Sequence, residues 1–186
     1  NHINASTFSS ENYHGKRDWA DKMDFFLAGY HALQEAAGDR LHILLGAEFR
    51  LFKHTATDYL VYGLTDEFLY THPEILTTGF AIFSQRVRAA GMFVVQAHPF
   101  RKHMMVTNPK LLDAIEVYNG NKRHCSRNDI ADIWADRFQM RKTSGSDTHR
   151  PDDDACAGIR TETPITNNEE LLAVLRSGNY TLIKEA

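Results

Sequence analysis

Apolar residues recur along this chain with two different spacings, one typical of helices and one typical of strands. Residues 16–38 carry apolar side chains three and four positions apart, which predicts an amphipathic helix. Its apolar face is expected to consist of Trp19, Met23, Phe26, Tyr30 and Leu33. Gly38 follows as the expected end of this helix, because glycine readily adopts the backbone conformations found at helix ends.

Later segments with the same helical spacing cover residues 77–91, 126–140 and 166–178. In the second of these helices we expect one buried face, formed by Ile130, Ile133, Trp134 and Phe138. The third begins with Thr166 and Glu169, which have the spacing of a capping box.

Short apolar runs between these helices predict strands, at residues 41–52, 58–64, 92–100, 112–120 and 180–183. Strands that alternate with helices of this length imply βαβ units and a mainly parallel sheet. An open sheet and a barrel both fit this pattern. We therefore predict an α/β fold in a single domain over residues 1–186, which is long enough to bury a sizeable core.

Composition narrows the classes of function and the compartment. The net charge is −3 at pH 7, so the charge balance favours neither membrane binding nor a stable complex with nucleic acid. The two cysteines, Cys125 and Cys156, stand far apart and outside any CxxC pair, as is typical of reduced thiols. No apolar run reaches the length of a membrane-spanning helix. We therefore expect a cytoplasmic protein.

Residues that can carry chemistry stand at the ends of the predicted strands. In parallel α/β folds the carboxyl ends of the strands lie at one edge, where binding sites form. Four predicted strand ends carry Glu48, His98, Asn119, and the pair Asp147 and His149. Asp147 and His149 are two residues apart, so on an extended chain they would point to the same side. Carboxylate and imidazole ligands together suit Zn²⁺, Mn²⁺ or Fe²⁺.

Each of these residues also has a simpler interpretation when it is taken alone. A glutamate after a strand is commonly solvated, and a histidine in such a place often bonds only the backbone. An aspartate next to serine and glycine favours a turn. The coincidence of such residues at four strand ends is the observation that favours a metal site over these interpretations.

Four short motifs in this order resemble those of the PHP (polymerase and histidinol phosphatase) family. They are GAE at residues 46–48, AHP at 97–99, IEVYNG at 115–120 and GSDTHRPDD at 145–153. The resemblance covers most of the chain, from His2 to the last helix and strand. It implies a distorted (βα)7 barrel similar to a TIM barrel, with a phosphoesterase site of two or three divalent metal ions at the carboxyl ends of the strands.

The resemblance also implies roles for individual residues. The metal ligands expected for two or three Zn, Mn or Fe ions are His2, Glu48, His98, Asp147 and His149. Glu48 stands in the place of the carboxylate that bridges two ions. Asn119 stands where many members have a histidine or cysteine ligand, which argues against a third ion. The family's N-terminal HxH pair does not occur in the sequence, so we expect the chain to lack the first βα unit of the barrel.

Together, the residues and the resemblance predict a metal-dependent phosphoesterase. This hydrolase would act on a phosphate monoester or diester of a small metabolite or nucleotide through metal-activated water. Glu48, Asp147 and His149 are the expected catalytic residues. Arg101 and Arg150 follow two of the ligands closely, and a guanidinium fork suits phosphate, although solvated loop charges are the alternative.

Two other functions for the whole chain stay open. A degenerate, non-catalytic PHP-like domain would serve binding or structure; the missing HxH pair and Asn119 favour it, while the intact ligand set argues against it. A metal-dependent amidohydrolase uses a similar barrel, but with histidines at different spacings.

Overall fold

A computed structural model describes residues 2–4, 6–9, 13–16, 18–51, 57–153 and 155–184 of the chain. Its main sheet has the spatial order β1-β2-β3-β4-β5-β6. The strands are β1 (His2–Ile3), β2 (Gly46–Phe49), β3 (Tyr59–Tyr62), β4 (Phe93–Gln96), β5 (Ala114–Asn119) and β6 (Arg141–Gly145). Two further strands, β7 (Ala157–Arg160) and β8 (Thr181–Lys184), pair antiparallel in a second sheet.

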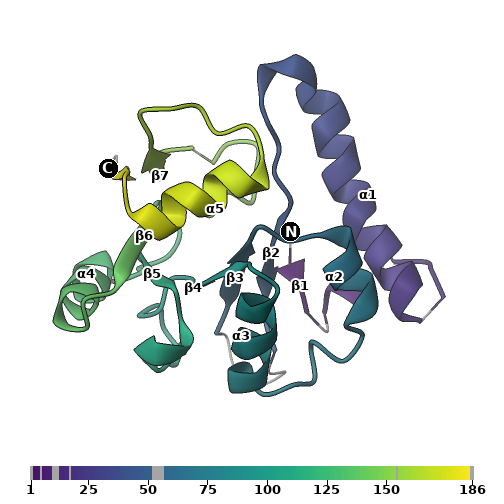
Figure 1. Cartoon of the computed structure of the whole chain (residues 1–186), viewed down its shortest axis with the longest axis horizontal. Coiled ribbons are helices and arrows are strands. Elements are labelled where there is room, and N and C mark those ends of the chain that lie inside the picture. The colour runs from purple at the N-terminus through teal and green to yellow at the C-terminus, as the bar shows by residue number, and fades with distance from the viewer. Residues whose placement is uncertain are drawn as a thin grey trace.

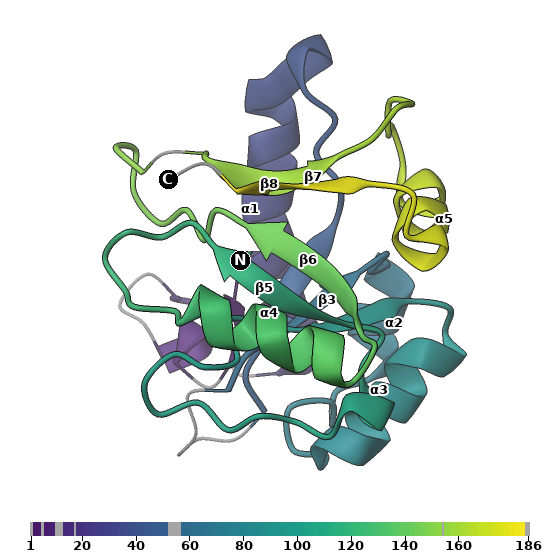
Figure 2. The ribbon, with the colours of Figure 1, turned by 90° about the vertical axis from the view of Figure 1, so that its left-hand side faces the viewer.

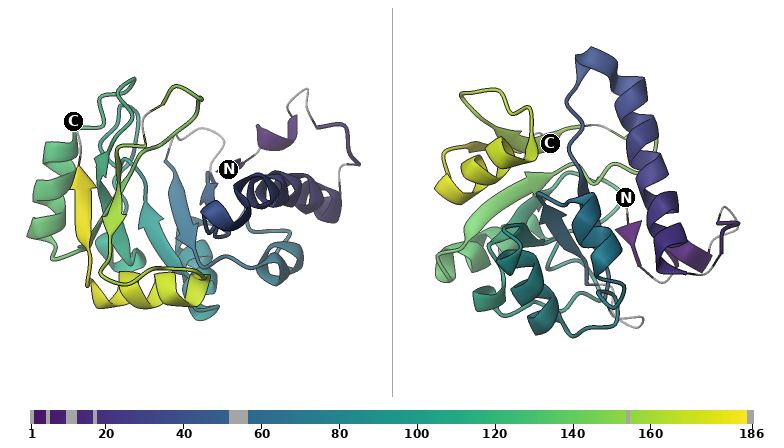
Figure 3. Two further views of the ribbon diagram at one scale, coloured as in Figure 1. Left: turned by 90° about the horizontal axis from the view of Figure 1, so that it is seen from above. Right: turned by 45° about the vertical axis from the view of Figure 1, so that its right-hand side comes forward.

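The helices lie around these sheets (Figure 1; Figure 3). They are α1 (Trp19–Ala37), α2 (Asp66–Thr71), α3 (Phe80–Ala89), α4 (Asn128–Arg137) and α5 (Asn168–Ser177), with short 3-10 turns at η1 (Thr7–Ser9), η2 (Gly38–Arg40) and η3 (Pro109–Leu111). The four helices predicted from apolar spacing all form. The sequence pattern did not predict α2 or β7.

Strand directions in the main sheet are mixed. β1 and β2, β4 and β5, and β5 and β6 pair parallel, whereas β3 runs antiparallel to both β2 and β4. Residues 50–58 alone connect β2 to β3, which is too short for the crossover that parallel neighbours need. The α/β class is confirmed. In the described part of the chain the sheet is open, so the closed (βα)7 barrel remains a prediction.

The two faces of the main sheet are covered by different helices. Phe49, Val61 and Val94 point to one face and pack in a cluster with α1, α2 and α3. Phe93 and Val95 point to the other face, where they pack against α5. Beside this, α4 lies along β5 and β6, as Figure 2 shows. Helices therefore occupy the faces, and the edge formed by the strand ends is left to the loops.

The buried face predicted for residues 126–140 is wrong for three of its four residues, whereas the fourth, Trp134, is partly buried and packs against the cluster between α4 and β5. α4 buries Ala131 and Ala135, which pack with Ile115 and Val117 of β5. Ile133 is 70% exposed, and Ile130 and Phe138 are exposed as well. The helix lies close to the sheet because alanines face it, so the larger apolar side chains stand at the flanks.

The capping box predicted for the last helix is shifted by one residue. Asn167 is the N-cap, and its side-chain oxygen accepts a hydrogen bond from the backbone of Glu170 (2.9 Å). The Glu170 carboxylate accepts one from the backbone of Thr166 in return (2.7 Å). Asparagine caps helices at least as well as threonine, so the reciprocal arrangement forms one position later than Thr166 and Glu169 suggest.

Three further predictions concern the extent of one strand, the cysteines and membrane-spanning helices. The strand expected over residues 41–52 forms only at β2, and residue 52 lies outside the described residues. Cys125 and Cys156 are both free thiols. Within the described residues, no helix has the length and apolar character needed to cross a membrane.

We predict that Phe83→Ala lowers the free energy of unfolding by about 3–5 kcal/mol, because it removes a buried ring and leaves a cavity. Phe83 is fully buried in α3, and its ring centroid lies 5.2 Å from that of Phe49. The neighbouring Ile82 is 49% exposed, and Ile82→Ala should change stability by only about 0.5 kcal/mol. Urea unfolding followed by circular dichroism measures both, and equal losses would contradict this packing.

Candidate metal centre

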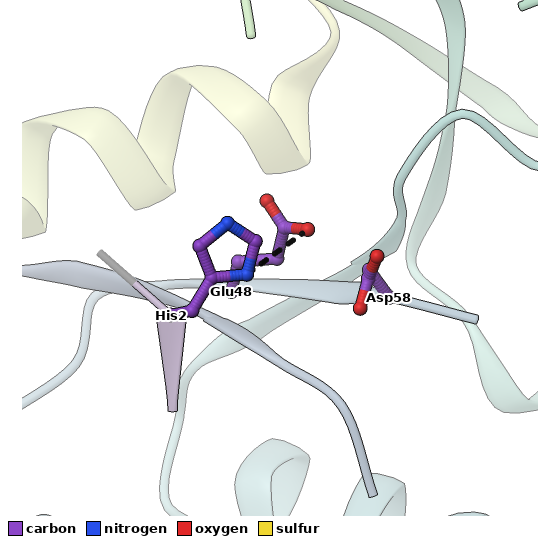
Figure 4. A group of neighbouring side chains, drawn as sticks. All are labelled: His2, Glu48 and Asp58. Carbon is purple, nitrogen blue, oxygen red and sulfur yellow. Dashed lines mark ion pairs between the residues drawn. The ribbon is translucent and has the colours of Figure 1, made fainter. Parts of the chain in front are cut away.

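The register of β1 on β2 brings two predicted ligands together. His2 pairs with Glu48 across the parallel strands, so both side chains stand on the same face. His2 Nδ1 lies 3.6 Å from Glu48 Oε1. Figure 4 shows this pair with Asp58 beside it, on three neighbouring segments at the edge of the sheet.

His98 enters the same cluster from the loop that follows β4. Its backbone is left-handed, with a φ of 28°, and its side chain is buried. Its Nε2 lies 3.7 Å from Glu48 Oε1 and 3.9 Å from Asp58 Oδ2. The turn at His98 is held by Glu116, whose Oε2 accepts a hydrogen bond from the His98 backbone N–H (2.8 Å).

Asp147 completes the cluster from the loop after β6, but its geometry differs from our expectation. Asp147 has a φ of 50°, so the chain here is left-handed and the extended-chain argument that paired it with His149 is wrong. Ligand atoms of Glu48, His98 and Asp147 lie within 4.8 Å of one another. The structure therefore brings three of the five predicted ligands into one group, and each comes from a different strand end.

His149 lines the site without joining either group of ligand atoms found among the described residues. Its side chain is 48% exposed, and its Nδ1 lies 2.8 Å from the backbone oxygen of Asp147. The ring centroids of His149 and His2 are 5.8 Å apart. His2 belongs to a second group instead, in which ligand atoms of His2, Glu48 and Asp58 lie within 4.8 Å of one another.

Asp58 is the residue that our sequence reasoning missed. We considered only carboxyl ends of strands, because we expected a mainly parallel sheet. Asp58 directly precedes β3, which runs antiparallel, so its amino end lies at the same edge as the carboxyl end of β2. The short connection over residues 50–58 was the signal that would have revealed this reversal.

These side chains line a cavity of about 310 Å³ at the edge of the sheet. Its lining contains all the predicted site residues: His2, Glu48, His98, Arg101, Asp147, His149 and Arg150. Four further residues complete the lining: Arg50, Asp58, Arg123 and His124. The cavity is thus lined entirely by carboxylate, imidazole and guanidinium groups.

The geometry of the cluster fits a divalent metal ion. Around one tetrahedral ion with bonds of about 2.1 Å, ligand atoms lie about 3.4 Å apart. Glu48 Oε1 lies 3.6 and 3.7 Å from ring nitrogens of His2 and His98, and His98 Nε2 lies 3.9 Å from Asp58 Oδ2. These separations are near this value and too long for hydrogen bonds. His98 Nδ1 is buried and has no hydrogen-bond partner among the described residues, so no protein contact fixes its tautomer.

Electrostatics keep Glu48 in the form that a metal requires. Burial alone would raise the pKa of Glu48, but His98 and His2 beside it lower that pKa to about 2. The carboxylate is therefore ionised at neutral pH, and two imidazoles face it. Mixed carboxylate and imidazole donors are the set that Zn, Mn and Fe ions accept.

Glu116 supports the cluster from below without lining the cavity. Complete burial raises the pKa of Glu116 to about 7. Its Oε2 accepts hydrogen bonds from the His98 backbone and from Asn119 Nδ2 (3.1 Å). Gly145 leaves room for it, because a Cβ there would lie 2.7 Å from Glu116 Oε1. Glu116 thereby holds both the His98 turn and the Asn119 amide.

Arg101 lines the cavity, but its side chain is tied to the protein. Its Nη2 donates to Asp147 Oδ2 (2.5 Å), and weaker contacts reach Asn119 Oδ1 (3.3 Å) and Ser126 Oγ (3.4 Å). The guanidinium therefore lies between Asp147 and the Asn119 amide. Asn119 is the residue that stands where many PHP members have a histidine or cysteine ligand.

Arg150 lies in a loop that Asp153 organises. Asp153 Oδ2 accepts hydrogen bonds from the backbones of His149 (2.6 Å) and Arg150 (2.9 Å), and its carboxylate pairs with Arg123. Asp153 thus shapes the loop that carries His149 and Arg150, while residue 154 lies outside the described residues. The Arg150 side chain is exposed at the rim of the cavity.

Comparisons with known proteins agree with the motifs. Residues 126–180, which include Asp147 and His149, match the family model described as PHP-associated. No curated protein matches the chain. A solved structure from Bacteroides vulgatus, a two-domain protein containing a predicted PHP-like metal-dependent phosphoesterase, superposes with a TM-score of 0.60 at 14% sequence identity. The match covers 84% of this chain and 49% of that one, so the chain spans about half the length of that protein.

The likeness to the Bacteroides protein is one of fold, whereas the match at residues 126–180 is one of sequence. The region matched by the family model contains the GSDTHRPDD motif, whereas the other three motifs lie outside that region. Over residues 126–180 the resemblance seen in the motifs is thus confirmed by a sequence match, and over most of the chain the likeness to a PHP-like protein is one of fold.

Proposed function

We propose that this chain is a metal-dependent phosphoesterase that hydrolyses a phosphate ester of a small metabolite or nucleotide. The observation that carries the proposal is the convergence of Glu48, His98 and Asp147, from three separate strand ends, within 4.8 Å. The name of the Bacteroides relative, a predicted metal-dependent phosphoesterase, supports the same reaction class. In this proposal the open sheet forms part of the distorted barrel that the PHP resemblance implies.

Two adjoining groups of residues would hold the metal ions. Glu48 belongs to both, so it would bridge one ion bound with His98 and Asp147 and another bound with His2. Zn, Mn or Fe ions at such a site lower the pKa of bound water and stabilise charge on phosphoryl oxygens. His149, near His2, is the exposed imidazole that we propose for proton exchange with the solvent side of the site.

The arginines of the cavity would bind the substrate. Arg150 at the rim is exposed and, within the described residues, its guanidinium has no ion-pair partner. Arg101 donates to Asp147 and would serve both the ligand and the phosphate. A cavity of about 310 Å³ suits a phosphate group with a small substituent and is too small for a structured nucleic acid.

A non-catalytic binding domain is the second candidate, and one contact favours it. The Arg101 guanidinium occupies one oxygen of Asp147, so a metal ion at this carboxylate has to share it with a cation. A chain that binds metal but never hydrolyses phosphate esters would fit this second function.

We predict that Glu48→Gln abolishes both metal binding and hydrolysis. The amide loses the charge that both groups of ligands share, so affinity for Mn²⁺ should fall by about 100-fold or more. Metal content after dialysis and hydrolysis of p-nitrophenyl phosphate measure the two effects.

Glu35→Gln, on the exposed surface of α1, is the matched control and should behave as wild type. Wild-type protein that takes up no Mn²⁺ or Zn²⁺ would contradict the metal centre. Wild-type protein that takes up metal but hydrolyses no phosphate ester would favour the binding domain instead.

Arg150→Ala should raise KM for a phosphate monoester by about tenfold, the equivalent of one charge-assisted hydrogen bond. Metal content should stay unchanged, because Arg150 holds no ligand through its side chain. The exposed Arg160 of β7 supplies the control Arg160→Ala, for which we expect no change in KM. Steady-state kinetics decide this, and an unchanged KM in Arg150→Ala would show that Arg150 is a solvated loop charge.

A further inference from the structure

Arg50 is a cavity residue to which neither the motifs nor the family comparison assigns a role. It stands two residues after Glu48 in the chain, just beyond β2. Its Nε donates to Asp58 Oδ1 and its Nη2 to Asp58 Oδ2, both at 2.6 Å. This is the two-pronged pairing in which a guanidinium is most firmly oriented. The Arg50 side chain is 33% exposed, while that of Asp58 is only 2% exposed.

The pairing limits what Asp58 can do. Its ligand atoms lie near those of His2 and Glu48, so Asp58 is a candidate metal ligand by distance alone. Both of its oxygens, however, already accept hydrogen bonds from Arg50. A metal ion bound there would place a second cation against the same buried carboxylate. The geometry therefore favours Asp58 as the residue that positions Arg50.

The remaining N–H groups of Arg50 are available to a ligand. A guanidinium carries more donors than the two that Asp58 uses, and no other acceptor within the described residues engages them. Arg50 lines the same cavity as Glu48 and His98. An oriented, permanently charged fork beside a metal-ligand cluster is the arrangement that recognises phosphate oxygens.

Two arginine–aspartate pairs lie on either side of His98 along the edge of the sheet. Asp58 precedes β3 and holds Arg50, and Asp147 follows β6 and holds Arg101. His98 follows β4, which lies between β3 and β6 in the spatial order. A phosphate group at the cluster would therefore meet a guanidinium from each side.

We propose that Arg50, positioned by Asp58, binds non-bridging oxygens of the substrate and makes the site selective for phosphate monoesters over diesters. This inference rests on the proposed phosphoesterase function. A monoester has three non-bridging oxygens, so one can face the metal cluster while two remain for a guanidinium fork. A diester has two and leaves only one for the fork. A monoester dianion also carries the additional charge that a second arginine offsets.

The test is Arg50→Lys, which keeps the positive charge beside Asp58 and removes the fork. We expect kcat/KM for p-nitrophenyl phosphate to fall by about tenfold or more, the loss of one charge-assisted contact. For bis(p-nitrophenyl) phosphate the fall in kcat/KM should be clearly smaller. The ratio of kcat/KM for the monoester to kcat/KM for the diester should therefore decrease. A purely structural defect would lower both equally. Bound Mn²⁺ should equal that of wild type.

Arg88→Lys is the matched control, because Arg88 also pairs with an aspartate, Asp113, at 3.0 Å, and lies outside the cavity lining. It should leave both substrates unaffected. Isothermal titration with inorganic phosphate in the presence of Mn²⁺ gives a second readout that needs no turnover. Here Arg50→Lys should weaken phosphate binding by about tenfold as well.

The outcomes separate the two proposals. A wild-type protein that binds phosphate but turns over neither ester would refute the phosphoesterase function. The titration with inorganic phosphate would still test whether Arg50 binds phosphate. Unchanged phosphate affinity and an unchanged monoester to diester ratio in Arg50→Lys would overturn the role of Arg50. Loss of Mn²⁺ from Arg50→Lys would overturn it too, since Arg50 would then act by holding the metal site together rather than by binding phosphate.

Discussion

The site depends on one constraint: β1 and β3, the two neighbours of β2, run in opposite directions. β1 is parallel to β2 and β3 is antiparallel to it, so two carboxyl ends and one amino end meet at the same edge. That edge receives His2, Glu48 and Asp58 from three neighbouring strands, and His98 arrives from the fourth. If a helical crossover replaced the short β2–β3 connection and made β3 parallel, Asp58 would lie at the far end of the sheet and Arg50 would lose its partner.

Charge pairing then keeps this crowded edge stable. Three carboxylates lie close together, and a buried carboxylate without a partner is costly. Glu48 has two imidazoles beside it, Asp58 has Arg50, and Asp147 has Arg101. Below them, Glu116 accepts hydrogen bonds from a backbone N–H and an amide. The site is therefore a connected network, in which the loss of one member changes the electrostatic surroundings of several others.

The sequence predicted the residues whose signal is local and missed those that depend on the pairing of strands. Glu48 and His98 could be found because they stand in or directly after recognisable apolar runs, and Asp147 because it lies in the GSDTHRPDD motif. Asp58 could not be found by the same reasoning, because its place depends on the direction of β3. The spacing of apolar residues located α4, yet the spacing alone cannot show that Ala131 and Ala135 face the sheet while Ile133 faces solvent. The left-handed backbone at Asp147 agrees with the turn that its serine and glycine neighbours favour, and it is the extended-chain interpretation that failed there.

The left-handed backbone at His98 and Asp147 has a consequence for how this chain can evolve. Residues with a side chain adopt such conformations at a cost, which glycine avoids and asparagine reduces. At these two positions the residue with the least backbone strain would be glycine, which supplies neither an imidazole nor a carboxylate. A lineage selected for heat resistance alone would drift toward glycine or asparagine there and lose the cluster while keeping the sheet. At His98 above all, the fold accepts a strained backbone at the same residue that brings an imidazole to the edge of the sheet.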